Sequence, residues 1–323
     1  MFVLVLLLIS GVLISMNSGY TRLSPLDLLQ TLLGQKKGDS SIILWSIRMP
    51  RIMIAMLVGA GLAVAGAIMQ GTSQNSLADP GILGINAGAG LGVVMYITVF
   101  YGKIQLAPVQ ALPIAAFIGA TFAAFIVFTL ARKNQRTTPT RLILVGIATG
   151  AGISAAMLFF TYRMDAYSYD FVKIWMSGSI WGTNWQYVKT AFFWMAVLLP
   201  LAVYKGFRLN LLSLGDDIAA SLGLSIQRER LVLLLLAVGL AGCSVALAGS
   251  ISFVGLIAPH LARRFVGADY KRVLPASLFI GALLVLAADT IGRTVVQPVE
   301  IPVGIVVAAL GGPYFLYLLI RQH

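Results

Sequence analysis

The sequence predicts an all-α, polytopic membrane protein with about ten transmembrane helices. Two observations carry this prediction. The chain of 323 residues is 59% hydrophobic and only 11% charged, with a mean hydropathy of +0.92, whereas soluble chains carry about 25% charged residues. Its apolar residues are also gathered in runs that approach the ~20 residues an α-helix needs to cross the hydrocarbon core of a bilayer.

Nine runs are long enough to be membrane spans. They lie near residues 2–20, 51–70, 84–101, 109–131, 141–162, 188–207, 231–249, 273–291 and 302–320. A tenth segment, residues 253–265, is shorter and contains Gly255 and Pro259, which is typical of broken helices that line cavities. We interpret the first run as a retained span rather than a signal peptide, because no basic residues precede it.

The basic residues indicate how the spans are oriented. The net charge of +12 does not indicate a nucleic-acid partner, because the basic residues cluster at the ends of apolar runs. With ten spans and both termini in the cytoplasm, most basic residues outside the first long loop lie on the cytoplasmic side, as the positive-inside rule predicts. Arg48, Arg51 and Arg293 then lie outside, where they either bind an acidic partner or extend to lipid headgroups.

A polar island, residues 209–230, separates two of the spans and reads LNLLSLGDDIAASLGLSIQRER. Asp216 and Asp217 follow Gly215, which predicts a short helix with acidic residues at its positive end. Gly223 should end that helix, and a second short helical piece is expected from Leu224 to Arg230. Two such helices on the cytoplasmic face would bind a partner; the alternative is a solvated loop that only connects two spans.

Two irregular stretches interrupt the spans. Residues 70–90, QGTSQNSLADPGILGINAGAG, are too rich in Gly, Asn and Pro for a plain lipid-facing helix, and residues 249–266 are a possible counterpart. Gly-rich segments precede both stretches, which suggests two related halves; the alternative is chance similarity between small-residue helices.

The sequence lacks the residue patterns that several kinds of chemistry require. No G-x-x-x-x-G-K-[ST] motif occurs, so the chain has no phosphate-binding loop and any ATP hydrolysis must come from elsewhere. No catalytic or metal site is expected, since His260 and His323 are the only histidines and Cys243 is the only cysteine. An ion-coupled carrier would use an acid inside a span, but Asp289 is one helical turn from Arg293, which favours a structural ion pair.

Nearly the whole chain resembles one family, the permease subunits of type II ATP-binding-cassette (ABC) importers for iron-siderophores, haem and cobalamin (FecCD-like transport system permeases). Six segments carry the resemblance: IRMPRIMIAMLVGAGLAVAGAIMQG (47–71), NSLADPGILGINAGAG (75–90), SLGDDIAASLGLS (213–225), ISFVGLIAPHLARRFVGADYKRVLP (251–275), ADTIGR (288–293) and EIPVGIVVAALGGPYFLYLL (300–319). The resemblance implies a single permease domain over residues 1–323 in the bacterial cytoplasmic membrane.

The resemblance also implies partners. These are a second permease subunit, identical or different, a cytoplasmic ATPase that carries ATP-Mg, and an extracytoplasmic binding protein; this chain would bind no cofactor. The coupling helices would lie at about residues 213–228, with the ATPase bound through Gly215, Asp216, Asp217, Ala220, Leu222 and Gly223. The binding protein would dock on Arg48, Arg51 and Arg293.

The resemblance further implies a substrate class, and the distribution of small residues suggests a path. Residues 173–185, KIWMSGSIWGTNW, are similar to a stretch of the siderophore branch and favour a ferric siderophore over haem or cobalamin. We expect the path along the spans at 51–70 and 141–162 and the irregular stretch 75–90, where small residues leave room for a bulky chelate. Its pathway and gate residues would include Gln70, Asn75, Pro80, Thr138 and Thr140. An ion-coupled secondary carrier and an intramembrane enzyme remain alternatives of other classes.

Overall fold

Each of the ten apolar segments forms a helix. The computed structural model describes residues 1–19, 24–33, 38–100, 108–133, 136–137 and 139–321. The ten helices are α1 (Phe2–Asn17), α4 (Met49–Ser73), α5 (Ile85–Met95), α6 (Pro108–Ala131), α7 (Pro139–Thr161), α9 (Trp185–Tyr204), α12 (Ile226–Ala248), α13 (Val254–Val266), α14 (Tyr270–Gly292) and α15 (Val303–Arg321). The all-α prediction is therefore confirmed.

The ten helices are not equally suited to a membrane. By length and composition α4, α6, α7, α9, α12 and α14 could each cross one. Three further helices, α1, α5 and α15, are apolar but shorter. The tenth, α13, has 13 residues with Pro259 inside it, in keeping with the broken segment expected from the sequence. The chain is a multi-pass membrane protein.

Short elements connect these helices. They are α2 (Pro25–Leu32), α3 (Asp39–Ser41), the π-helical turns η1 (Ile42–Arg48) and η3 (Tyr96–Phe100), the 3₁₀ turn η2 (Pro80–Leu83), α8 (Ala166–Met176), α10 (Gly206–Ser213) and α11 (Asp216–Ser221). Between α6 and α7 the two-residue strands β1 (Arg132–Lys133) and β2 (Arg136–Thr137) pair antiparallel, with Arg132 opposite Thr137.

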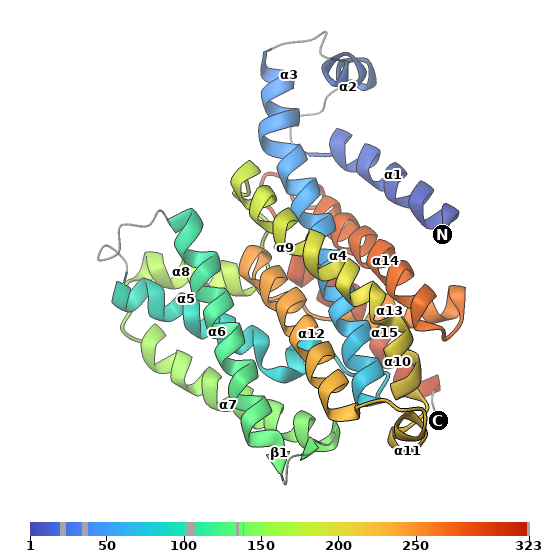
Figure 1. The fold of residues 1–323 in the computed structure, drawn as a ribbon. Coiled ribbons are helices and arrows are strands. Elements are labelled where there is room, and N and C mark those ends of the chain that lie inside the picture. The colour runs from blue at the N-terminus through green and yellow to red at the C-terminus, as the bar shows by residue number, and fades with distance from the viewer. Residues whose placement is uncertain (20–23, 34–37, 101–107, 134–135, 138, 322–323) are drawn as a thin grey trace.

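Helix α4 runs through the middle of the bundle and packs against α12 and α14 (Figure 1). Small residues allow this close approach. A Cβ atom on Gly59 would overlap the carbonyl oxygen of Gly281 in α14, and one on Gly66 would overlap that of Gly255 in α13. In a membrane, where helices gain little from burying apolar surface against one another, such contact between backbones is a main source of packing energy.

The two irregular stretches meet beside α4. The first, predicted over residues 70–90, is shorter than expected, because α4 continues to Ser73 and α5 begins at Ile85. It starts at Gln74, which ends α4 with φ 51°. The second begins before α13, where Phe253 has φ 67°. A Cβ atom on Gly255 would lie 2.8 Å from Cδ of Pro80, so only glycine allows the two stretches to approach so closely. The breaks predicted from the sequence therefore lie at one place in the bundle.

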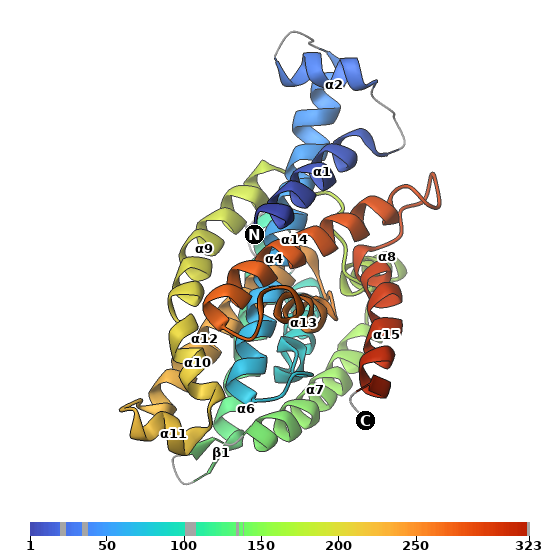
Figure 2. The same cartoon turned by 90° about the vertical axis from the view of Figure 1, so that its right-hand side faces the viewer.

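The bundle has two distinct ends (Figures 1 and 2). We call one the arginine end, because it holds Arg48, Arg51 and Arg293 together with α2 and α3. The opposite end holds α10, α11 and the β1–β2 pair, and we call it the elbow end. The residues predicted to dock the binding protein and those predicted to bind the ATPase thus lie at opposite ends.

Candidate functional site

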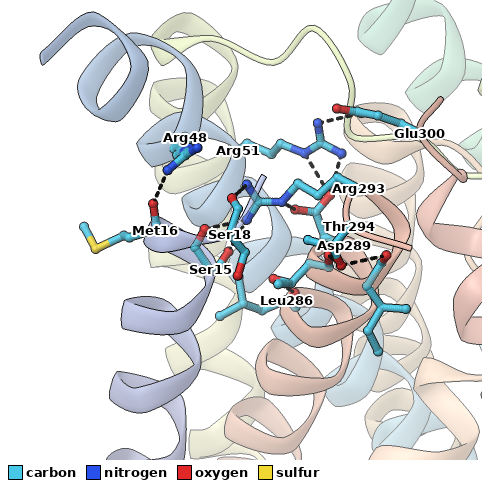
Figure 3. Close-up of polar contacts among 12 residues, drawn as sticks. Ser15, Met16, Ser18, Arg48, Arg51, Leu286, Asp289, Arg293, Thr294 and Glu300 are labelled. Atoms are coloured by element: carbon cyan, nitrogen blue, oxygen red, sulfur yellow. Dashed lines mark hydrogen bonds and ion pairs between the residues drawn. The ribbon is translucent and has the colours of Figure 1, made fainter. Parts of the chain in front are cut away.

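At the arginine end, three arginines from different elements converge with Asp289 and Glu300 (Figure 3). Arg48 ends η1, Arg51 lies in the first turn of α4, and Arg293 directly follows α14. Arg51 donates hydrogen bonds of 2.8 Å from Nε to Oδ1 of Asp289 and from Nη1 to Oε2 of Glu300. Because Asp289 is fully buried and Glu300 partly exposed, Arg51 joins the interior of the bundle to its surface.

Arg293 completes the pairing of Asp289 and holds the end of α1. Its Nε lies 3.4 Å from Oδ2 of Asp289, one helical turn earlier, which confirms the ion pair predicted from their spacing. Its other nitrogens donate to the carbonyl oxygens of Ser15 at 2.7 Å and Ser18 at 2.9 Å. Ser15 lies in the last turn of α1 and Ser18 directly follows the helix, where carbonyl groups have no backbone partners within the helix.

Arg48 supports the same helix end by donating to the carbonyl oxygen of Met16. Gly19 passes between the guanidinium groups, and a Cβ atom there would lie 3.2 Å from Nη2 of Arg48 and 3.6 Å from Nη1 of Arg293. The two arginines are only 5% and 7% exposed. The arginine cluster (Arg48, Arg51, Arg293, Asp289 and Glu300) therefore fixes α1 to α4 and α14, and docking of an acidic partner on it stays a prediction.

At the elbow end, α10 and α11 form a bent segment, residues 206–225, which we call the elbow. Gly215, with φ 102°, separates the two helices, and Gly223, with φ 81°, separates α11 from α12. The second helical piece expected from Leu224 to Arg230 does not exist separately, because Ile226 to Arg230 form the first turn of α12. The long apolar helix extends by one turn into the polar residues, and the other short helix of the elbow is α10.

One face of the elbow packs on the bundle. Leu209 and Leu212 are buried at 0% and 1% exposure, and Ala219 of α11 is also buried. Polar contacts add to this packing, since the side-chain amide of Gln74 donates 2.9 Å to the carbonyl oxygen of Leu212. Helix α10 is therefore held against α4 and α14, and α11 against α10 and α12, rather than forming a loose loop.

The opposite face of the elbow is exposed and apolar. Leu214, Ile218 and Leu222 are 53%, 51% and 58% exposed. Ile218 and Leu222 are four residues apart and share one side of α11 and its C-terminal cap, whereas Leu214 precedes the bend at Gly215. Asp217, Ala220 and Gly223 are exposed as well. An exposed apolar row on a polar connection is a typical feature of a binding surface.

Ion pairs fasten the elbow to its neighbours. Asp216 accepts from Nη2 of Arg230 at 2.9 Å, and Arg230 is only 3% exposed. Lys205, just after α9, pairs with Glu229 in the first turn of α12 at 2.8 Å. Of the predicted coupling residues, Asp216 therefore has a partner within the chain, Gly215 is half-buried at the bend, and the other four are exposed.

The predicted pathway residues do not form one cluster. Gln70 and Pro80 are both buried and both contact Gly255. Asn75 instead caps its own turn by accepting from the backbone N–H of Leu77 at 2.9 Å. Thr140 is exposed in the first turn of α7, and Thr138 lies outside the described residues. Their roles in a path or gate stay predictions.

Sequence reasoning missed several polar contacts that the fold creates, of which three illustrate the point. Arg51 with Asp289, Gln70 with Arg263, and Asn210 with Asp269 join residues that are 238, 193 and 59 positions apart. For Gln70 and Asp289 the signal in one sequence is a polar side chain within a largely apolar segment, whereas Asn210 and Asp269 lie in polar connections and give no such signal.

The sequence of the chain is similar to those of named permease proteins. The chain is 47% identical over 326 residues to the iron(3+)-hydroxamate import system permease protein FhuG of Bacillus subtilis, covering 100% of this chain and 97% of the relative. It is 40% identical to the hemin transport system permease protein HmuU of Yersinia pestis, with coverage of 100% and 95%.

The chain also matches solved structures and a family model. A metal-chelate type ABC transporter in an inward-facing conformation has a TM-score of 0.87 at 31% identity, covering 99% of this chain and 98% of that one. PsaBC from Streptococcus pneumoniae has the same fold, with a TM-score of 0.57 at 16% identity over 90% and 94%. The model of the FecCD transport family matches residues 6–321. The chain therefore belongs to the FecCD transport family.

Proposed function

We propose that the chain is the membrane-spanning permease subunit of an ATP-driven importer. The observation that carries this proposal is the exposed apolar row Leu214, Ile218 and Leu222, held on a packed elbow at one end of the bundle. Because the chain has no phosphate-binding loop of its own, an ATP-driven permease of this kind needs a surface on which a separate ATPase can bind. Membership of a transport family supports the same assignment.

The proposed assembly has three kinds of partner. A cytoplasmic ABC ATPase carrying ATP-Mg binds the elbow, a second permease subunit completes the membrane part, and an extracytoplasmic binding protein delivers substrate at the arginine end. This places the elbow, both termini and the β1–β2 pair in the cytoplasm of a bacterium, with the bundle in its cytoplasmic membrane. The permease itself catalyses no reaction and binds no cofactor.

We propose a ferric siderophore as the substrate. Relatives named as permeases for iron(3+)-hydroxamate and Fe(3+)-citrate are 47% and 44% identical to this chain and support this class. Haem remains the closest alternative, because the hemin permease of Yersinia pestis is 40% identical. Cobalamin, the third substrate class that the family resemblance implies, stays open.

The test is uptake of radiolabelled ferric hydroxamate by bacterial cells with and without the gene for this chain. We expect uptake to depend on the chain and to persist in the presence of excess haemin. Uptake that excess haemin abolishes would favour the haem alternative, and uptake that is the same without the chain would contradict the proposal.

An ion-coupled secondary carrier is the runner-up of another class. Its best support is Asp289, a fully buried acid in a spanning helix. Arg51 and Arg293 both pair with this carboxylate, however, so it lacks the freedom to exchange a proton or sodium ion. Copurification separates the two classes, because only the importer forms a stable complex with an ATPase.

A further inference from the structure

A buried polar chain of contacts begins at Gln70 in the second half of α4. The side-chain amide, only 3% exposed, donates to the carbonyl oxygens of Gly255 at 3.2 Å and Leu256 at 3.4 Å. Its oxygen accepts from Nη2 of Arg263. Gln70 thus holds the first turn of α13 and, at the same time, an arginine two turns further along that helix.

Arg263 extends the chain of contacts to α14. Its guanidinium also lies close enough to the hydroxyl of Tyr270, the first residue of α14, for the two groups to interact. Tyr270 is 7% exposed, and a Cβ atom on Gly71 would lie 3.0 Å from its hydroxyl oxygen. Because Gly71 has no side chain, the ring of Tyr270 has room beside Gln70.

Tyr270 in turn is fixed to the elbow. Its backbone N–H donates to Oδ1 of Asn210 in α10 at 2.8 Å, and the amide of Asn210 donates to Oδ1 of Asp269 at 2.6 Å. The backbones are also in contact here, since a Cβ atom on Gly206 would lie 3.2 Å from the carbonyl oxygen of Tyr270. A displacement of α10 must therefore displace the start of α14.

The far end of these contacts is the place where the two irregular stretches meet. The carbonyl groups that Gln70 holds belong to the residues just after Phe253, whose left-handed backbone begins α13. Gly255 contacts both Pro80 and the carboxylate of Asp79, whose Oδ2 would lie 3.0 Å from an added Cβ atom. This backbone lies between helices rather than facing lipid, as irregular structure in a membrane requires.

We propose that Gln70, Arg263 and Tyr270 are positioning residues that couple the location of α10 to the backbone at the start of α13. The inference rests on the proposed function for its purpose, since an ATPase on the elbow would use this link to act on the centre of the bundle. Buried and partly buried hydrogen bonds suit the task, because a polar group displaced there without its partner is left unsatisfied, which favours movement of the linked groups together. Because proximity alone does not show coupling, the experiment must measure whether a change at α10 alters the start of α13.

The test measures hydrogen–deuterium exchange of the full chain in lipid nanodiscs. Asn210→Ala cuts the link at the elbow, and we expect it to raise exchange of the amides of residues 253–257 by about threefold or more. Arg263→Met should raise the same amides, and adding Asn210→Ala to it should give no further increase, because both changes break one link. Arg264→Met, the loss of an exposed arginine next in sequence, is the matched control and should leave these amides unchanged.

Two results would overturn the inference. One is an Asn210→Ala effect confined to α10 and the start of α14; the other is independent, multiplying effects of Asn210→Ala and Arg263→Met. If Arg263→Met does not fold, Tyr270→Phe takes its place under the same criterion, because it removes one hydroxyl and keeps the ring. The exchange experiment contains neither ATPase nor substrate, so a negative result in the uptake test would not change its outcome. Failure of the proposed function and failure of this inference are therefore distinguishable.

Discussion

The arginine cluster and the elbow lie at opposite ends of the bundle, and the sequence predicts a binding role for both. Their surfaces differ in kind. The charged groups of the cluster make contacts within the chain, with Asp289 fully buried, whereas the elbow exposes Leu214, Ile218 and Leu222. A buried charge needs a partner inside the protein, while an exposed apolar row gains most from a partner outside it. Charge at a helix end is therefore the weaker sign of a binding surface.

The largest expected effect comes from breaking the cluster at its centre. Asp289→Asn leaves Arg51 and Arg293 with a neutral amide in place of the buried carboxylate. Removing one partner of a buried ion pair typically lowers the free energy of unfolding by about 3–5 kcal/mol, so we expect a clear loss of thermal stability in detergent and of protein in the membrane.

Glu300→Gln is the matched control, because Glu300 also pairs with Arg51 but is partly exposed. An exposed pair contributes about 0–1 kcal/mol, so stability should change little. Equal stability losses in the two variants would show that the cluster is not the internal clamp described here.

A smaller effect concerns docking at the arginine end. If carboxylates of a binding protein compete with Glu300 for Arg51, then Glu300→Gln should tighten capture of that protein by about two- to fivefold at low salt. The gain should shrink as ionic strength rises. Surface plasmon resonance with the chain in nanodiscs measures both, and an affinity that Glu300→Gln leaves unchanged would exclude competition for Arg51.

Charge reversal is a poor test of docking. Replacing Arg51 and Arg293 by glutamate would place two carboxylates beside the buried Asp289, and replacing Arg48 and Arg293 would remove the arginine donors at the end of α1. We expect such a chain to fold poorly, so a loss of docking would have two explanations.

The smallest expected effect concerns the pKa of Asp269, which accepts a hydrogen bond from Asn210 of α10. Hydrogen bonds from Asn210 and from the backbone of Lys271 favour the carboxylate form of Asp269 and lower its pKa. Such a group stabilises the fold above its unfolded pKa of about 3.9, and the contribution is lost as pH falls through the folded pKa.

Asn210→Ala should therefore raise the pKa of Asp269 toward its ordinary value. Carbon-13 NMR of labelled aspartate would show the variant accepting its proton at a higher pH than the wild-type chain. Identical titration curves would mean that Asn210 does not hold this carboxylate.

The sequence predicts the spans better than it predicts the contacts between them. Apolar runs of about twenty residues specify helices directly, because burying backbone groups in lipid permits few other structures. Boundaries are less well specified: the run at 188–207 ends as α9 at Tyr204, and α10 begins at Gly206. Helix α12 starts at Ile226, before the apolar run, because nothing in its polar first turn disfavours a helix.

Long-range pairs are the part that one sequence cannot supply. Arg51 and Asp289 are recognisable as polar residues near helix ends, but which residue each contacts depends on how α4 and α14 cross. The same holds for Gln70 and Arg263. The exposed row of the elbow could be predicted as helical, but its exposure depends on which face Leu209 and Leu212 bury.

The most direct test of the account is the affinity of the chain for its ATPase subunit when Leu222 is changed. Leu222→Arg puts a charge into the exposed row at its most exposed residue, whereas Leu222→Met keeps the site apolar and serves as the control. The account predicts that Leu222→Arg lowers the affinity by at least about tenfold and abolishes uptake, with unchanged thermal stability, and that Leu222→Met binds as the wild-type chain does. Normal ATPase binding and normal uptake by the Leu222→Arg chain would contradict the assignment of the elbow as the coupling surface.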